Sequence, residues 1–202
     1  NNFLDLDFLS LIESNKIDYC LNLMKAYKYS DDQLNKIINI ANSSSKCLAI
    51  NIVDSSGCMS ENEVFNIASK LSQLAKSNIG VHIHNNIGLA NKISYESLDR
   101  GYSADSTLLG KGRMGGNADT ILLILYSALK NTGNIKQLDE FIQKILNCTS
   151  IVWGHEAREH ILSLMIGLTG LHSSKLSKNI LSSLDTLPNL TTMISNAWNY
   201  EK

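Results

Sequence analysis

The chain has 202 residues, roughly enough for one to one and a half domains, and 44% of them are hydrophobic while 18% are charged. These proportions supply a packed core and exclude an intrinsically disordered chain. The net charge of −1 disfavours nucleic-acid and polybasic membrane-surface binding, and the apolar runs are too short to span a bilayer. No basic and apolar leader opens the sequence, so we expect a cytoplasmic protein with no nucleic-acid or membrane partner.

Apolar runs rich in β-branched residues predict four strands, near residues 17–24, 48–54, 79–84 and 104–109. Their starts are 31, 31 and 25 residues apart, which is about the length of a βα unit. Strands that are apolar on both faces and alternate with helices predict an α/β fold with a parallel sheet. Cys20 and Cys47 lie inside such runs, and we expect both to be buried thiols.

Helical patterns separate the predicted strands. Ser30 is a candidate cap for one helix, and Ser60 with Glu63 three residues later forms a candidate capping box for the next. The expected buried stripe of that second helix is Val64, Ile67, Leu71 and Leu74. Further helices are expected at 89–98 and 118–129, and only helical patterns follow, at 135–147, 155–169, 173–184 and 189–198.

Two architectures fit this alternation. One is a complete doubly wound open sheet of four or five strands. The other is part of a (β/α)₈ barrel, of which four βα units would be half. Composition does not choose between them.

The most informative motif lies at the end of the third predicted strand. His82 and His84 are two residues apart, so both side chains point to the same face of a strand. Parallel α/β folds bind ligands at this end of their strands, and two imidazoles at this spacing can bind one divalent cation. A pair of hydrogen-bonded strand-end histidines is the alternative. Asn85 and Asn86 add polar groups where the strand gives way to a helix.

A glycine-rich loop follows the fourth predicted strand. Gly110, Gly112 and Gly115 formally match the GxGxxG dinucleotide fingerprint. That fingerprint belongs to a first βα turn with an acid ending the next strand, and this context is missing here. We interpret the segment as a loop whose glycines let backbone approach a ligand, with Asn117 offering an amide; a plain flexible turn is the alternative.

Asp54 ends the second predicted strand and begins a polar turn. Its carboxylate has three possible roles: ligating a metal, orienting His82, or capping the helix that follows. Taken alone, the pattern favours the cap.

Two further motifs are set aside. The segment 155–160 is similar to the HExxH zinc motif, but Glu159 stands where the second histidine is needed. Lys25, after the first predicted strand, fits a solvated lysine better than a Schiff-base nucleophile.

Together these segments resemble the HMG-CoA lyase-like metal-dependent aldolases and lyases, and among them the 4-hydroxy-2-oxovalerate aldolases most closely. The resemblance rests on HIHNNIGLAN at 82–91, GKGRMGGN at 110–117 and DSSGCMS at 54–60. Trp153-Gly154 and Leu171-His172 are similar to a helical segment of the aldolase branch, and the whole resemblance runs from about Asp18 to His172.

The resemblance implies a (β/α)₈ TIM barrel, of which residues 1–130 would be the C-terminal half, with a helical extension at 131–202. His82 and His84 would be the two histidine ligands of a divalent metal, Mn²⁺ or Mg²⁺. Asn117 would help to bind metal or substrate, and Asn86 and Asp54 are the other expected substrate-binding residues.

The activity implied is that of a metal-dependent lyase (an aldolase) that cleaves or forms a C–C bond of a 4-hydroxy-2-oxo acid. The oxo acid would chelate the metal, which stabilises the pyruvate enolate left when an aldehyde departs. No general base is identified in this half. The alternative within the superfamily is an acyl-CoA-dependent synthase similar to isopropylmalate or homocitrate synthase. Such synthases generally read HND where this chain has His84-Asn85-Asn86, which mildly favours the aldolases.

Members of this family begin with a strand carrying an Arg-Asp pair, in which the aspartate is the third metal ligand and the arginine steadies the enolate. This chain has no such strand, and no arginine precedes Arg100. We therefore expect a complex with an N-terminal half-barrel or a homo-oligomer, because two open sheet edges and an apolar face would need cover. A non-catalytic half-barrel that serves as an interaction subunit is the non-enzymatic alternative.

Overall fold

The computed structural model describes residues 5–130, 144, 160–161, 163–164 and 167. The chain divides into two units, Asn1–Asp119 and Thr120–Lys202, and each is described by itself. The helices expected at 173–184 and 189–198 lie outside the described residues, and those at 135–147 and 155–169 lie almost entirely outside them.

The first unit alternates strands and helices as the sequence predicts. Its elements are α1 (Leu6–Ser14), β1 (Tyr19–Met24), the 3₁₀ turn η1 (Ala26–Lys28), α2 (Asp31–Ser43), β2 (Cys47–Asp54), α3 (Glu61–Leu74), β3 (Asn78–Ile83), α4 (Ala90–Asp99), β4 (Ser103–Ala104) and the 3₁₀ turn η2 (Leu108–Gly110). In the second unit the structure describes α5 (Thr120–Lys130). None of the described helices has the length and apolar character needed to cross a bilayer.

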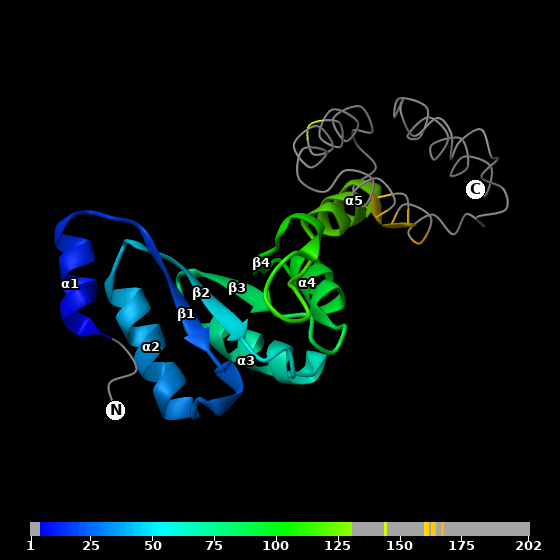
Figure 1. Ribbon diagram of the computed structural model, residues 1–202. Helices are drawn as coiled ribbons and strands as arrows, with labels where there is room; N and C mark the ends of the chain where they lie inside the picture. Colours follow the sequence, from blue (N-terminus) through cyan, green and yellow to red (C-terminus); the bar gives the residue numbers. More distant parts are fainter. Residues whose placement is uncertain (1–4, 131–143, 145–159, 162, 165–166, 168–202) are drawn as a thin grey trace, which may run out of the picture. The chain divides into compact units, whose positions relative to one another are not determined.

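The four strands form one sheet in the order β1-β2-β3-β4, and every neighbouring pair is parallel (Figure 1). The order of the strands in the described sheet is therefore the same as their order in the sequence. A doubly wound sheet reverses its strand order at a switch point, whereas successive barrel strands lie side by side. The topology thus corresponds to half of a TIM barrel.

Side-chain capping fixes where the helices begin. The side chains of Ser30 and Ser60 each accept a hydrogen bond from the backbone N–H three residues later. In return, the side chains of Gln33 and Glu63 accept from the backbone N–H of the respective serine. The capping box at Ser60 is confirmed, and Ser30 forms one as well. Val64 and Leu71 of the expected α3 stripe are buried, whereas Ile67 is half-buried and Leu74, the last residue of the helix, is 59% exposed.

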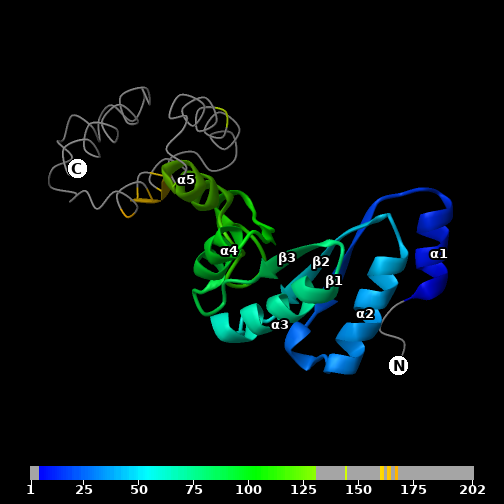
Figure 2. The same cartoon turned by 180° about the vertical axis from the view of Figure 1, so that it is seen from behind.

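Helices cover one face of the sheet. Figures 1 and 2 view the unit from opposite sides and show α2, α3 and α4 along the same side of the strands. On that face the side chains of Ile50, Ile52, Val81 and Ile83 are at most 2% exposed. This layer is the hydrophobic core of the unit, and burying four such side chains stabilises it by roughly 1.5–3 kcal/mol each.

The opposite face of the sheet is mixed: a row of polar residues crosses it, and apolar Val53 lies on the same face. Asn22, Asn51, Gly80 and Ser103 stand in register on the four strands. The Asn51 amide donates to Asn22 Oδ1 at 3.0 Å, so two side chains inside apolar runs satisfy each other across the sheet. A Cβ on residue 80 would overlap Asn51 Oδ1, which explains the glycine.

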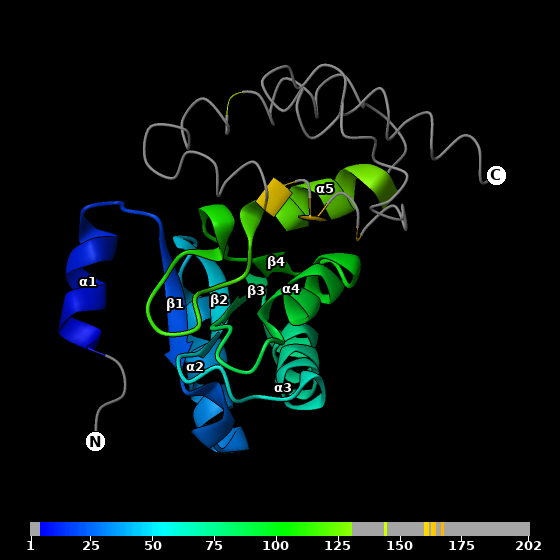
Figure 3. The same ribbon diagram turned by 45° about the vertical axis from the view of Figure 1, so that its right-hand side comes forward.

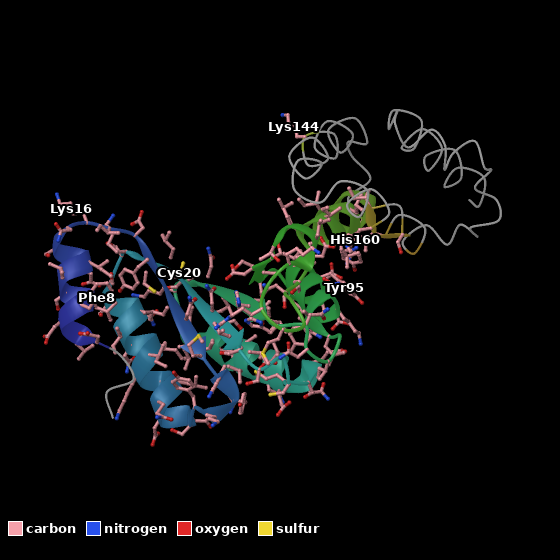
Figure 4. The ribbon with its side chains drawn as sticks, in the orientation of Figure 1. Phe8, Lys16, Cys20, Tyr95, Lys144 and His160 are labelled. Carbon is pink, nitrogen blue, oxygen red and sulfur yellow. The ribbon has the colours of Figure 1, made fainter. Side chains whose placement is uncertain are left out.

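Two further expectations need correction. The fourth strand is only Ser103–Ala104, because the chain turns into η2 where the prediction continued the strand to residue 109. Cys20 is exposed, whereas Cys47 is buried as expected. Cys20 belongs to the edge strand β1 and stands on the open face, level with Ala49 of β2 (Figure 4).

Candidate metal and substrate site

The two histidines meet at the carboxyl end of β3. His82 is in the strand and His84 directly follows it, and their ring centroids are 5.4 Å apart with the rings tilted by 61°. A nitrogen ligand lies about 2.0–2.1 Å from a zinc-class ion, so rings at this separation can reach one cation. The donor set of the predicted histidine pair therefore fits a divalent metal.

Asp105 is a site residue that the sequence analysis missed. Its Oδ2 lies 3.2 Å from His82 Nδ1. Asp105 follows β4 by one residue, and its backbone N–H donates to Val81 O, so it continues the parallel ladder beside His82. The signal was available in the sequence, as an acid at the end of the strand next to the histidine strand. A carboxylate on Nδ1 holds the proton there and leaves Nε2 as the ligand atom.

The surroundings of His84 favour its neutral form. Burial lowers its pKa most, and the charges of His82 and Arg113 lower that pKa further, while Asp54 opposes them. A metal binds the neutral imidazole, so this shift favours His84 as a ligand near neutral pH.

Asn117 lies beside His84 through an isolated antiparallel bridge between the two residues. Its amide nitrogen donates to Lys111 O at 3.2 Å. Its Oδ1 is buried and has no hydrogen-bond partner among the described residues. A buried amide oxygen without a donor is costly, and it is a suitable ligand for a hard cation or an acceptor for a substrate hydroxyl.

Asn86 joins three loops at the same end of the sheet. Its amide nitrogen donates to Ser56 O at 2.8 Å, and its Oδ1 accepts from Gly115 N at 3.0 Å. A Cβ on Gly115 would lie 2.7 Å from Asn86 Cα, so the loop after β4 approaches this closely only with glycine. The structure gives Asn86 an organising role, and its contact with substrate stays a prediction.

Asp54 is fully buried, and its Oδ2 accepts from Met59 N at 2.7 Å. It pairs with Ile83 across the strands, so its side chain leaves the sheet on the face opposite to His82. The cap of α3 is Ser60 and not Asp54, whose carboxylate instead holds the turn that leads into that helix. The predicted contact of Asp54 with substrate is therefore not part of the proposed site.

Among the residues that the structure describes, no cluster brings three His, Cys, Asp or Glu side chains together as a metal site. The described residues therefore supply two histidines and an amide oxygen.

Two curated proteins are similar to this chain over 61% of its length. Both are 4-hydroxy-2-oxovalerate aldolases, from Pelotomaculum thermopropionicum (32% identity over 127 residues) and Thermus thermophilus (33% over 132 residues). The matched part is 36% of either relative, so the chain spans just over a third of their length.

The fold has a solved counterpart, and a family model covers most of the chain. The N-terminal domain of a putative aldolase from Bacteroides vulgatus superposes with a TM-score of 0.60 at 24% identity, over 78% of this chain and 54% of that one. A sequence model named HMGL-like matches residues 6–152. Because this match covers well over half of the 202 residues, the chain belongs to the HMGL-like family.

Proposed function

We propose that the protein is a divalent-metal-dependent lyase of the aldolase type, acting on the C3–C4 bond of a 4-hydroxy-2-oxo acid. The observation that carries the proposal is the cluster of His82, His84 and the unpartnered Asn117 Oδ1 at one end of the sheet. The two aldolase relatives support the substrate class.

Each residue has a stated task in this proposal. His82 and His84 would hold Mn²⁺ or Mg²⁺, with Asp105 fixing the tautomer of His82. When bound, the metal supplies Lewis acidity to the 2-oxo acid. Asn117 would accept from a substrate hydroxyl or contribute its oxygen to the metal. The base that takes the proton from the 4-hydroxyl is not among the residues named here.

The test is the Mn²⁺ affinity of the complete protein, measured by calorimetric titration. His82→Ala should abolish detectable binding, because the remaining neutral donors hold a hard cation poorly. Asn78→Ala is the matched control, since it changes an exposed residue at the other end of the same strand and should leave the affinity unchanged. Equal Mn²⁺ affinity in the His82 variant and the wild type would refute the metal assignment.

Activity is tested separately. The complete protein with Mn²⁺ should release pyruvate from a 4-hydroxy-2-oxo acid, and a synthase would instead consume an acyl-CoA with a 2-oxo acid. A non-catalytic interaction subunit would do neither.

A further inference from the structure

The loop after β4 brings one arginine to the histidine site. Residues 110–117 are fastened to the end of β3: Gly116 O accepts from Asn85 N at 3.0 Å, and Asn117 bridges to His84. Figure 3 shows the green segment after β4 returning toward the sheet before α5 begins. Arg113 is exposed in this loop, and its backbone oxygen accepts from Gly116 N in the turn that carries it.

The turn includes a residue in an unfavourable backbone conformation. Met114 has a φ of +55° and is 89% exposed, so a side chain with no packing of its own occupies the left-handed region. This geometry costs a non-glycine residue about 1–2 kcal/mol. Unfavourable backbone of this kind persists where surrounding contacts fix it, and here those contacts are the bonds to Asn85 and Asn86.

Arg113 lies on the loop whose residue Asn117 bridges to His84, and its charge is one of the causes that lower the pKa of that imidazole. Arg113 itself has no carboxylate within ion-pair distance among the described residues, whereas Lys46, Lys70 and Lys92 each have one. Arg100, the other described arginine, lies over the Phe65 ring at 4.1 Å. Arg113 is thus an exposed cation on the loop fastened to the histidine strand, with no carboxylate paired to it among the described residues.

We infer that Arg113 binds the carboxylate of the substrate, next to the two histidines. This inference rests on the proposed function and names the group that recognises the acid part of the 2-oxo acid. A guanidinium presents two parallel N–H donors that match the two oxygens of a carboxylate, which an ammonium group does not. The backbone bonds to Asn85 and Asn86 hold the loop of Arg113 at the end of the sheet where the histidines lie.

The experiment compares two ligands and three proteins. Pyruvate and methyl pyruvate, which lacks the carboxylate charge, are titrated into the complete Mn²⁺-loaded protein in its wild-type, Arg113→Gln and Arg113→Lys forms. Arg113→Gln should weaken pyruvate binding about 10- to 100-fold and leave methyl pyruvate binding nearly unchanged. Arg113→Lys should fall between, because it keeps the charge and loses the fork.

Mn²⁺ affinity is the independent readout. Arg113→Gln should retain or slightly increase it, because a positive charge near His84 is removed; this also shows that the variant is folded. If pyruvate binds wild type and Arg113→Gln equally, the inference is overturned and the proposed function stands. If the Mn²⁺-loaded wild type binds no pyruvate, the proposed function falls and the inference falls with it.

Discussion

At the scale of single residues, the site depends on which ring nitrogens are free of protons. Asp105 accepts from His82 Nδ1 at 3.2 Å, and burial together with two neighbouring charges lowers the pKa of His84. The first contact orients the ring of His82, and the second effect favours the neutral form of His84. An HxH pair alone would not guarantee this, because each imidazole binds a proton and a metal at the same nitrogen.

We therefore expect His84 to titrate at a lower pH than an ordinary histidine. The proton is bound more weakly, so on acidification His84 stays neutral below the pH at which a solvated histidine becomes charged. The Cε1–H resonance of His84 in the metal-free protein measures this directly, with His84→Gln to assign it. Replacing Arg113 by Gln should raise the pKa of His84, because it removes one of the two positive charges that lower this pKa. The effects of His82 and Asp54 remain. An identical midpoint in both proteins would contradict this account.

At the scale of elements, the two faces of the sheet are stabilised by different contacts. Helices bury the aliphatic face, and the polar row of Asn22, Asn51, Gly80 and Ser103 fixes how the strands stand against each other on the other. The amide bond between Asn51 and Asn22 is satisfied only in this register, so a slip of one residue would unpair it.

Gly80→Ala tests this row. The new Cβ would overlap Asn51 Oδ1 and lie 2.7 Å from Ser103 Oγ, so we expect a loss of about 1–3 kcal/mol in the free energy of unfolding. Urea denaturation of Gly80→Ala, Asn51→Ala and the double variant forms a cycle. The double variant should lose less than the sum of the single ones, because removing the Asn51 amide makes room for the methyl group. Additive losses would show that the two positions do not conflict.

At the scale of the whole molecule, the described sheet ends in β1 on one side and in β4 on the other. Parallel edge strands pair readily with other strands, so the topology favours further strands beside both edges. Among the described residues, no carboxylate joins the two histidines in a cluster of three metal-binding side chains.

We therefore predict that the 202-residue chain does not stay a monomer in its functional form. Light scattering should report a dimer or a complex with an N-terminal half-barrel, and tight Mn²⁺ binding should accompany that assembly. The isolated chain should bind Mn²⁺ weakly and release no pyruvate. A monodisperse monomer that binds Mn²⁺ tightly and cleaves a 4-hydroxy-2-oxo acid would contradict both parts.

Much of this molecule follows from the sequence alone. The spacing of the apolar runs determined the four parallel strands, since strand and helix periods differ and each run is bounded by its own caps. The spacing of His82 and His84 placed both on one face, because the strand period is two.

Only the tertiary structure decided which distant residues lie next to one another. Asp105 reaches His82 through strand pairing, and the loop that carries Arg113 comes to the end of β3 through its bonds to Asn85 and Asn86. The Asn22–Asn51 pair joins residues 29 apart and places a polar contact on a face that was expected to be apolar. Local periodicity fixes which side of an element a residue occupies, whereas its partners across the sheet depend on register and loop closure, which involve distant residues at once.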